Sequence, residues 1–105
     1  MTSRPRERSI ERYFVRKVKE AGGEVRKVKW IGRAHAPDRL VLWPGKDSIH
    51  WSGYHPLVEV KRPGEKPRPG QKREHARLAA AGFQVFTLST TTEVDNFVFR
   101  YACRR

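Results

Sequence analysis

The chain has 105 residues, 37% of them hydrophobic, which is sufficient for one domain around a single core, residues 1–105. Lysine and arginine number 23 against 11 acidic residues, and the net charge of +12 favours a polyanionic partner, above all nucleic acid. No apolar run approaches the ~20 residues that span a bilayer, so no membrane partner is expected. The single cysteine, Cys103, excludes an internal disulfide and a cysteine-based zinc site, and it fits a reducing intracellular setting.

Hydrophobic periodicity and turn residues divide the chain into seven predicted elements. In chain order these are a helix over 5–21, a strand within 24–31, a strand over 40–43, a strand over 57–61, a helix from 69 or 70 to 81, a strand over 83–89 and a helix from 91 onward. Residues 44–56 form a turn-rich connection that can hold a short hairpin. Thr92 and Asp95 are expected to cap the last helix. The order αβββαβα describes an α/β domain with a mixed sheet flanked by helices.

The segment "LVEVKRPGEKPRPGQKREH", residues 57–75, combines a short apolar strand with two charged residues. In a strand, Glu59 and Lys61 project from one face, while Val58 and Val60 point into a core on the other. An E-x-K pattern of this kind also occurs on solvated strands that carry only a cross-strand ion pair. Further residues are therefore needed to distinguish an active site from an ordinary surface.

Asp38 supplies a second carboxylate, because it lies at the start of the second predicted strand, directly after Pro37. If the second and third strands pair antiparallel, Asp38 lies near Glu59. Two carboxylates at adjacent strand ends form a hard oxygen site suited to Mg²⁺ or Mn²⁺. Such an ion activates water, and Lys61 beside it can orient that water or stabilise a developing anion, as phosphodiester hydrolysis requires.

Glu11 lies on the inward-facing stripe of the first predicted helix, where a carboxylate is costly to bury without a partner. A metal ion or Lys61 would be such a partner, and Glu7, one turn earlier, is the alternative acid. Glu11 can also be a first-turn acid that interacts favourably with the helix dipole if Ser9 is the N-cap.

The order of these features resembles the PD-(D/E)xK nuclease superfamily, whose core is αβββαβ; here the motif is Pro37-Asp38 followed by Glu59-Val60-Lys61. Residues 7 to 90 further resemble the virus-type replication-repair (VRR-Nuc) nuclease family, most strongly from the lysine through the basic loop to Gln71. The resemblance implies that Asp38, Glu59 and the Val60 carbonyl hold the metal, and that Lys61, Glu11 and Gln71 are catalytic. His35 occupies a position where the family pattern has a glycine.

Gln71 can orient Lys61 or a phosphate near the helix end, or it can be a helix-terminal polar residue without a chemical role. Basic residues around these positions are expected to contact DNA phosphates. They are Arg33, His35, Arg39, Arg62, Lys66, Arg68, Lys72 and Arg73. Trp43, Trp51 and Tyr54 stack on bases, cover the core or form a subunit interface, and we favour the interface.

Together these features predict a metal-dependent, structure-selective endonuclease in the cytoplasm of a bacterial or phage-infected cell. Standalone VRR-Nuc domains resemble Holliday-junction resolvases, so we expect a homodimer that acts on four-way DNA junctions. The alternatives are a nuclease of the same fold that cuts flaps or linear duplexes, and a non-catalytic nucleic-acid-binding module.

Overall fold

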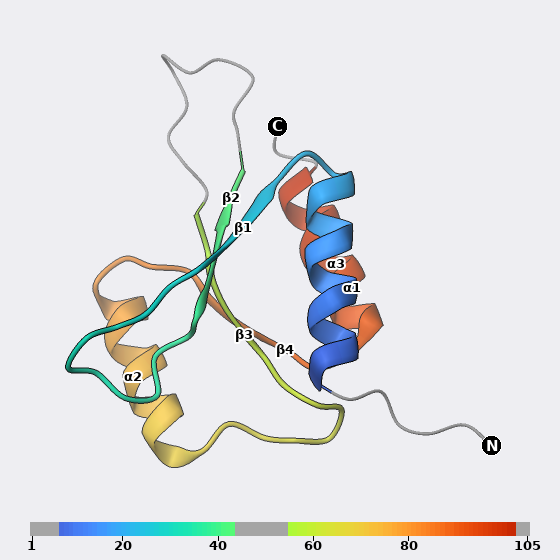
Figure 1. Cartoon of the computed structure of the whole chain (residues 1–105). Coiled ribbons are helices and arrows are strands. Elements are labelled where there is room, and N and C mark those ends of the chain that lie inside the picture. The colour runs from blue at the N-terminus through green and yellow to red at the C-terminus, as the bar shows by residue number, and fades with distance from the viewer. Residues whose placement is uncertain (1–6, 44–54, 103–105) are drawn as a thin grey trace, which may run out of the picture.

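The elements of the computed structural model, which describes residues 7–43 and 55–102, follow the predicted order (Figure 1). They are α1 (Glu7–Glu20), β1 (Glu24–Lys27), β2 (Arg39–Leu42), β3 (Leu57–Val60), α2 (Pro69–Ala80), β4 (Val85–Leu88) and α3 (Thr91–Ala102). Most of the predicted hairpin segment, residues 44–54, lies outside the described part, as do Trp51 and Tyr54. Within that part, no helix has the length and apolarity that a membrane span requires.

The four strands form one mixed sheet in the order β1-β2-β3-β4. The first three pair antiparallel, and β3 pairs parallel with β4 after the crossover through α2. Figure 1 shows α1 and α3 packed together on one side of the sheet and α2 on the other. The mixed sheet with helices on both faces, an αβββαβ core extended by α3, confirms the predicted α/β fold class.

The main core lies between the sheet and the α1–α3 layer, where Phe14, Val18, Val41 and Val58 are fully buried. Trp43 belongs to this core: it is only 1% exposed, and its ring stacks on that of Tyr101, with centroids 6.2 Å apart. The subunit interface favoured for Trp43 from sequence is therefore wrong. A tryptophan directly after a short strand inside a basic sequence gives no local sign of whether its ring turns inward.

The first strand is shorter than predicted, because it ends at Lys27 and not near residue 31. Val28 still donates from its backbone N–H to the carbonyl of Asp38, at 2.8 Å. The indole N–H of Trp30 then donates to the carbonyl of Pro37, also at 2.8 Å. These two bonds close residues 28–38 into a loop, which Figure 1 shows passing beside α2.

The N-terminus of α3 is capped two residues earlier than the sequence suggested. The Thr90 hydroxyl oxygen accepts from the backbone N–H of Glu93 at 3.1 Å, so Thr90 and not Thr92 is the capping residue. Asp95 instead accepts a hydrogen bond from the Tyr13 hydroxyl, at 2.7 Å, and so links α3 to α1. Three consecutive threonines precede Glu93, and the helix begins at the second of them, which the sequence alone does not decide.

Candidate active site

The pairing of β2 with β3, extended by one residue, would bring two carboxylates opposite one another. The register pairs Arg39 with Val58 and Leu40 with Leu57, so the next step places Asp38 opposite Glu59. Like charges directly opposed across antiparallel strands repel, which favours a shared cation between them. The predicted convergence of these two acids agrees with this register and stays a prediction.

Glu59 and Lys61 project from the face of β3 that is turned toward α2, whereas Val58 and Val60 belong to the core on the α1–α3 side. This separation was predicted from the E-x-K spacing. The Lys61 backbone N–H donates to the carbonyl of Leu88 at 2.8 Å, which continues the parallel pairing of β3 with β4. The position of Lys61 is therefore fixed by the sheet.

The Lys61 ammonium lies in a sheltered position, because its side chain is only 9% exposed. Its Nζ pairs with Oε1 of Glu65 at 3.5 Å, across the first turn of the basic loop. On α2, the Nε2 atom of His75 is buried and has no hydrogen-bond partner among the described residues. Burial, together with the positive charge of Lys61, lowers the pKa of His75. Sequence reasoning missed both Glu65 and His75, although His75 lies one helical turn after Gln71.

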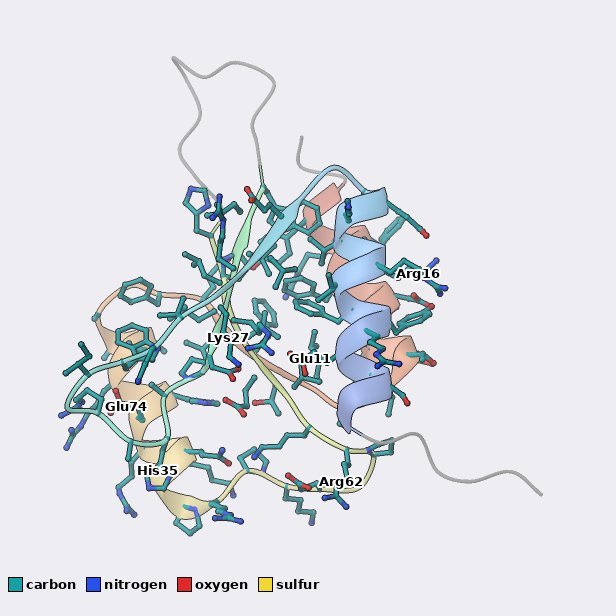
Figure 2. The ribbon with its side chains drawn as sticks, in the orientation of Figure 1. Glu11, Arg16, Lys27, His35, Arg62 and Glu74 are labelled. Atoms are coloured by element: carbon teal, nitrogen blue, oxygen red, sulfur yellow. The ribbon has the colours of Figure 1, made fainter. Side chains whose placement is uncertain are left out.

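Glu11 lies on the side of α1 that faces the sheet, whereas Arg16 points away from it (Figure 2). Its partner is Arg39 rather than Lys61, because the Nη2 atom of Arg39 forms an ion pair with Oε1 of Glu11. The same guanidinium reaches Asp38, with Nη1 at 3.1 Å from Oδ2. Arg39 therefore joins α1 to the first of the two opposed carboxylates. The side chain of Glu7 lies outside the described part.

Gln71 is buried in the first turn of α2, where its side-chain oxygen accepts from the backbone N–H of Arg68 at 2.9 Å. It thus stabilises the start of α2 as the reciprocal half of a capping box. This contact agrees with the alternative that Gln71 is a helix-terminal polar residue without a chemical role. Gly70 and Pro69 complete a first turn without an acidic side chain.

The 28–38 loop is attached to α2 by two contacts. Arg33 donates to Glu74, with Nη2 at 2.7 Å from Oε1 and Nε at 3.4 Å from Oε2, and the hydrogen bond lowers the pKa of Glu74. Next to this pair, the His35 ring lies so close to Gly70 that a Cβ there would be 2.7 Å from Cδ2. Figure 2 shows His35 and Glu74 on the α2 side of the molecule.

The backbone of His35 explains the departure from the family pattern noted in the sequence. Its φ of 68° lies in the left-handed region, which glycine adopts without strain and which histidine tolerates better than most residues. The position therefore retains the glycine-type conformation despite carrying a ring. That ring occupies the space beside Gly70, which has no side chain of its own.

The basic residues predicted to contact DNA divide into two groups. Seven of them are at the surface: Arg33, His35, Arg62, Lys66, Arg68, Lys72 and Arg73. Arg39 is different, because its side chain is 13% exposed and engaged with two acids. A pocket of about 200 Å³ lies between the loop and α2. Arg33, His35 and Arg73 line it together with Arg77, a basic residue that was not predicted to contact DNA. Arg77 is one turn after Arg73, so helical spacing could have indicated it.

The donor set at the β2–β3 junction suits a hard divalent cation. Mg²⁺ is commonly held by one or two carboxylates together with waters and substrate phosphates, so Asp38 and Glu59 would be sufficient as the carboxylate ligands from the protein. Within residues 7–43 and 55–102, no group of three or more histidine, cysteine, aspartate or glutamate side chains is arranged so that it could hold a metal ion.

The mixed sheet, the helices on both faces and the Asp38–Glu59–Lys61 arrangement together define a nuclease core of the PD-(D/E)xK type. A solved structure described as a VRR_NUC domain superimposes with a TM-score of 0.75 and 34% identity, covering 90% of this chain and 96% of that one. A protein of Acyrthosiphon pisum secondary endosymbiont phage 1, named "Putative nuclease p44", is 47% identical over 85 residues, or 81% of this chain and 84% of that protein. No family model matches the sequence. The chain belongs to the VRR-Nuc family of nucleases.

Proposed function

We propose that this protein is a metal-dependent, structure-selective DNA endonuclease, and that two copies act together as a Holliday-junction resolvase. The observation that carries the proposal is the register of β2 and β3, which brings Asp38 opposite Glu59 when it is extended by one residue, with Lys61 on the same face of β3 as Glu59. A nucleic-acid-binding module has no reason to present two opposed carboxylates toward a polyanion. The phage relative supports action inside a bacterial or phage-infected cell.

Asp38, Glu59 and the main-chain carbonyl of Val60 would hold Mg²⁺ or Mn²⁺. When bound, such an ion lowers the pKa of a water molecule and neutralises charge on the phosphate. Lys61 lies on the same face and would orient the attacking water or stabilise the negative charge that develops on the phosphate. A DNA phosphate would compete for the Lys61 ammonium with Glu65, whose Oε1 lies 3.5 Å from Nζ and whose side chain is 41% exposed.

Two adjoining pockets support a path for DNA toward this site. The pocket between the loop and α2 shares Arg33 and His35 with a second pocket of about 570 Å³. The second pocket is also lined by Lys27, Lys29 and Asp38. We call the two together the basic depression. It would bind phosphates along a line that runs from α2 to the carboxylates, with Arg62, Lys66, Arg68 and Lys72 as further phosphate contacts.

The resolvase proposal requires two sites related by a two-fold axis, because a symmetric four-way junction presents two equivalent strands. One domain of this size contains one such site. Light scattering of the protein alone and with an excess of junction DNA tests this requirement. A strict monomer in both samples would rule out paired cleavage, while cleavage of flaps or linear duplexes by one copy would remain.

The direct test is cleavage of a labelled four-way junction, a 5′ flap and a linear duplex with Mg²⁺, Mn²⁺ or EDTA. Lys61→Met retains an apolar stem in this buried position, so it removes the ammonium with little loss of packing. Lys61→Ala is the second variant, and Lys19→Ala on the exposed part of α1 is the matched control. Circular dichroism verifies that each variant is folded.

We expect symmetric cuts on the junction that depend on the metal, are lost in both Lys61 variants and persist in Lys19→Ala. DNA binding in EDTA is expected to survive in all three variants. Cuts confined to flap or linear DNA would retain the chemistry and change the substrate. Tight binding without cleavage of any DNA would support the binding-module alternative and contradict the nuclease mechanism.

A further inference from the structure

Arg39 differs from every other predicted DNA contact in the described part of the chain, because its guanidinium is directed into the protein. Its side chain is 13% exposed, against 45% for Arg33 and 66% for Arg62. Nη2 pairs with Glu11, while Nη1 pairs with Asp38 and also donates to the Asp38 carbonyl at 3.3 Å. A phosphate in solution would have to displace both acids to reach this group.

The position of Arg39 in the sheet explains how it connects these acids. Arg39 is the first residue of β2, and its side chain extends toward α1. Because adjacent residues of an extended chain alternate, Asp38, directly before the strand, is expected on the α2 face. Arg39 is paired with Val58, a core residue, which confirms the side on which its stem lies. The guanidinium then bends back to the Asp38 carboxylate. One side chain thereby connects an acid of α1 to the acid directly before β2.

A guanidinium is suited to this connection in a way that an ammonium is not. Its planar fork directs separate N–H donors toward two acceptors, whereas a lysine places a single charge at one point. It also offsets part of the repulsion between Asp38 and the opposed Glu59. Both of its partners remain in contact with solvent, since the side chains of Glu11 and Asp38 are 29% and 48% exposed.

We propose that Arg39 is a positioning residue of the nuclease site: it fixes the Asp38 carboxylate opposite Glu59, and Glu11 acts through Arg39 rather than on the metal or the DNA. This replaces the phosphate contact expected for Arg39 from the sequence. The proposal rests on the metal-dependent nuclease function proposed above. In this proposal Glu11 holds Arg39 in place, and Asp38 and Glu59 are the carboxylates that would bind the metal.

The test uses Arg39→Gln and Arg39→Lys, measured for cleavage and for DNA binding. A misplaced catalytic group typically costs about 100-fold in rate, so kcat at saturating metal and DNA is expected to fall by that order in both variants. Arg39→Lys should not rescue the rate, because an ammonium cannot reach both acids. The two variants are expected to fold, because the acids they leave behind reach water.

Binding in EDTA separates positioning from phosphate contact without reference to activity. Binding weakens as salt rises, and loss of one phosphate contact reduces the magnitude of the slope of log K against log salt by about 0.9. We expect Arg39→Gln to leave both the slope and the affinity unchanged, whereas Arg62→Gln, the exposed control, makes the slope less steep. A less steep salt dependence in Arg39→Gln together with an unchanged kcat would overturn the proposal.

The role of Glu11 is decided by a double-mutant cycle. If Glu11 acts through Arg39, then the variant that combines Glu11→Gln with Arg39→Gln loses no more activity than Arg39→Gln alone. Additive losses would mean that Glu11 contacts the metal or the substrate itself. If the wild type cuts no DNA with either metal, the nuclease proposal fails, and the salt slope alone decides whether Arg39 contacts phosphate.

Discussion

Replacing Gln71 separates its structural contact from any role in chemistry. In Gln71→Ala, the backbone N–H of Arg68 loses the acceptor that lies 2.9 Å away, in a site where Gln71 itself is 9% exposed. Loss of a side-chain cap costs about 1 kcal/mol, and a domain of this size loses about 4–8 °C in Tm for each such step. Gln71→Glu keeps the acceptor oxygen, so its stability is expected to remain near that of the wild type.

The assay is urea unfolding of the wild type, Gln71→Ala and Gln71→Glu, followed by junction cleavage at a temperature where all three are folded. If the amide N–H₂ of Gln71 donates to a phosphate, Gln71→Glu retains its stability and loses cleavage. Full cleavage by Gln71→Glu would assign Gln71 to capping alone. A Gln71→Ala variant as stable as the wild type would refute the capping argument.

Three further predictions concern positions packed around the site and the core. Gly23→Ala is expected to destabilise the fold by about 1–3 kcal/mol in urea unfolding, because the new Cβ would lie 2.6 Å from a ring carbon of the buried Trp43; unchanged stability would mean that the ring can shift. Gly70→Ala is expected to destabilise the wild type, where it meets the His35 ring, and to stabilise a His35→Gly background by about 0.5–1 kcal/mol through helix propensity; a gain in both backgrounds would contradict the clash. The lowered pKa of His75 means that the unfolded chain binds a proton first as the pH falls below about 6.5, so stability should decrease there, and His75→Leu should reduce this dependence; equal pH profiles would exclude His75 as its source.

The face and order of the main site residues could be predicted from local rules. Strand alternation places Glu59 and Lys61 together, and antiparallel pairing of the neighbouring strands brings Asp38 opposite Glu59. The start of α2 near Pro69 follows from proline at the first turn, and Gly82 after its end has the left-handed φ of 103° typical of that position. These predictions depend only on neighbours in sequence and on the pleat of the sheet.

The contacts that the sequence did not indicate depend on how separate elements pack. Arg39 resembles an ordinary surface arginine until α1 is placed across the sheet with Glu11 toward it. The inward turn of Trp43 requires the space that Gly23 leaves, twenty residues earlier in the chain. Glu65 lies in a loop whose direction after β3 no periodic pattern determines, so its pairing with Lys61 becomes evident only in three dimensions.

The seam between β2 and β3 makes the candidate site depend on the meeting of two parts of the fold. Its two sides are separate supersecondary units, a helix with a hairpin that supplies Asp38 and a β-α-β crossover that supplies Glu59 and Lys61. The seam has two paired positions, while the other two strand pairs have four each. A nascent chain that has closed either unit alone carries only one of Asp38 and Glu59, so the proposed mechanism predicts cleavage only after the units dock. Separately expressed halves should accordingly be inert alone and recover cleavage on mixing, as expected when non-local pairing completes the fold.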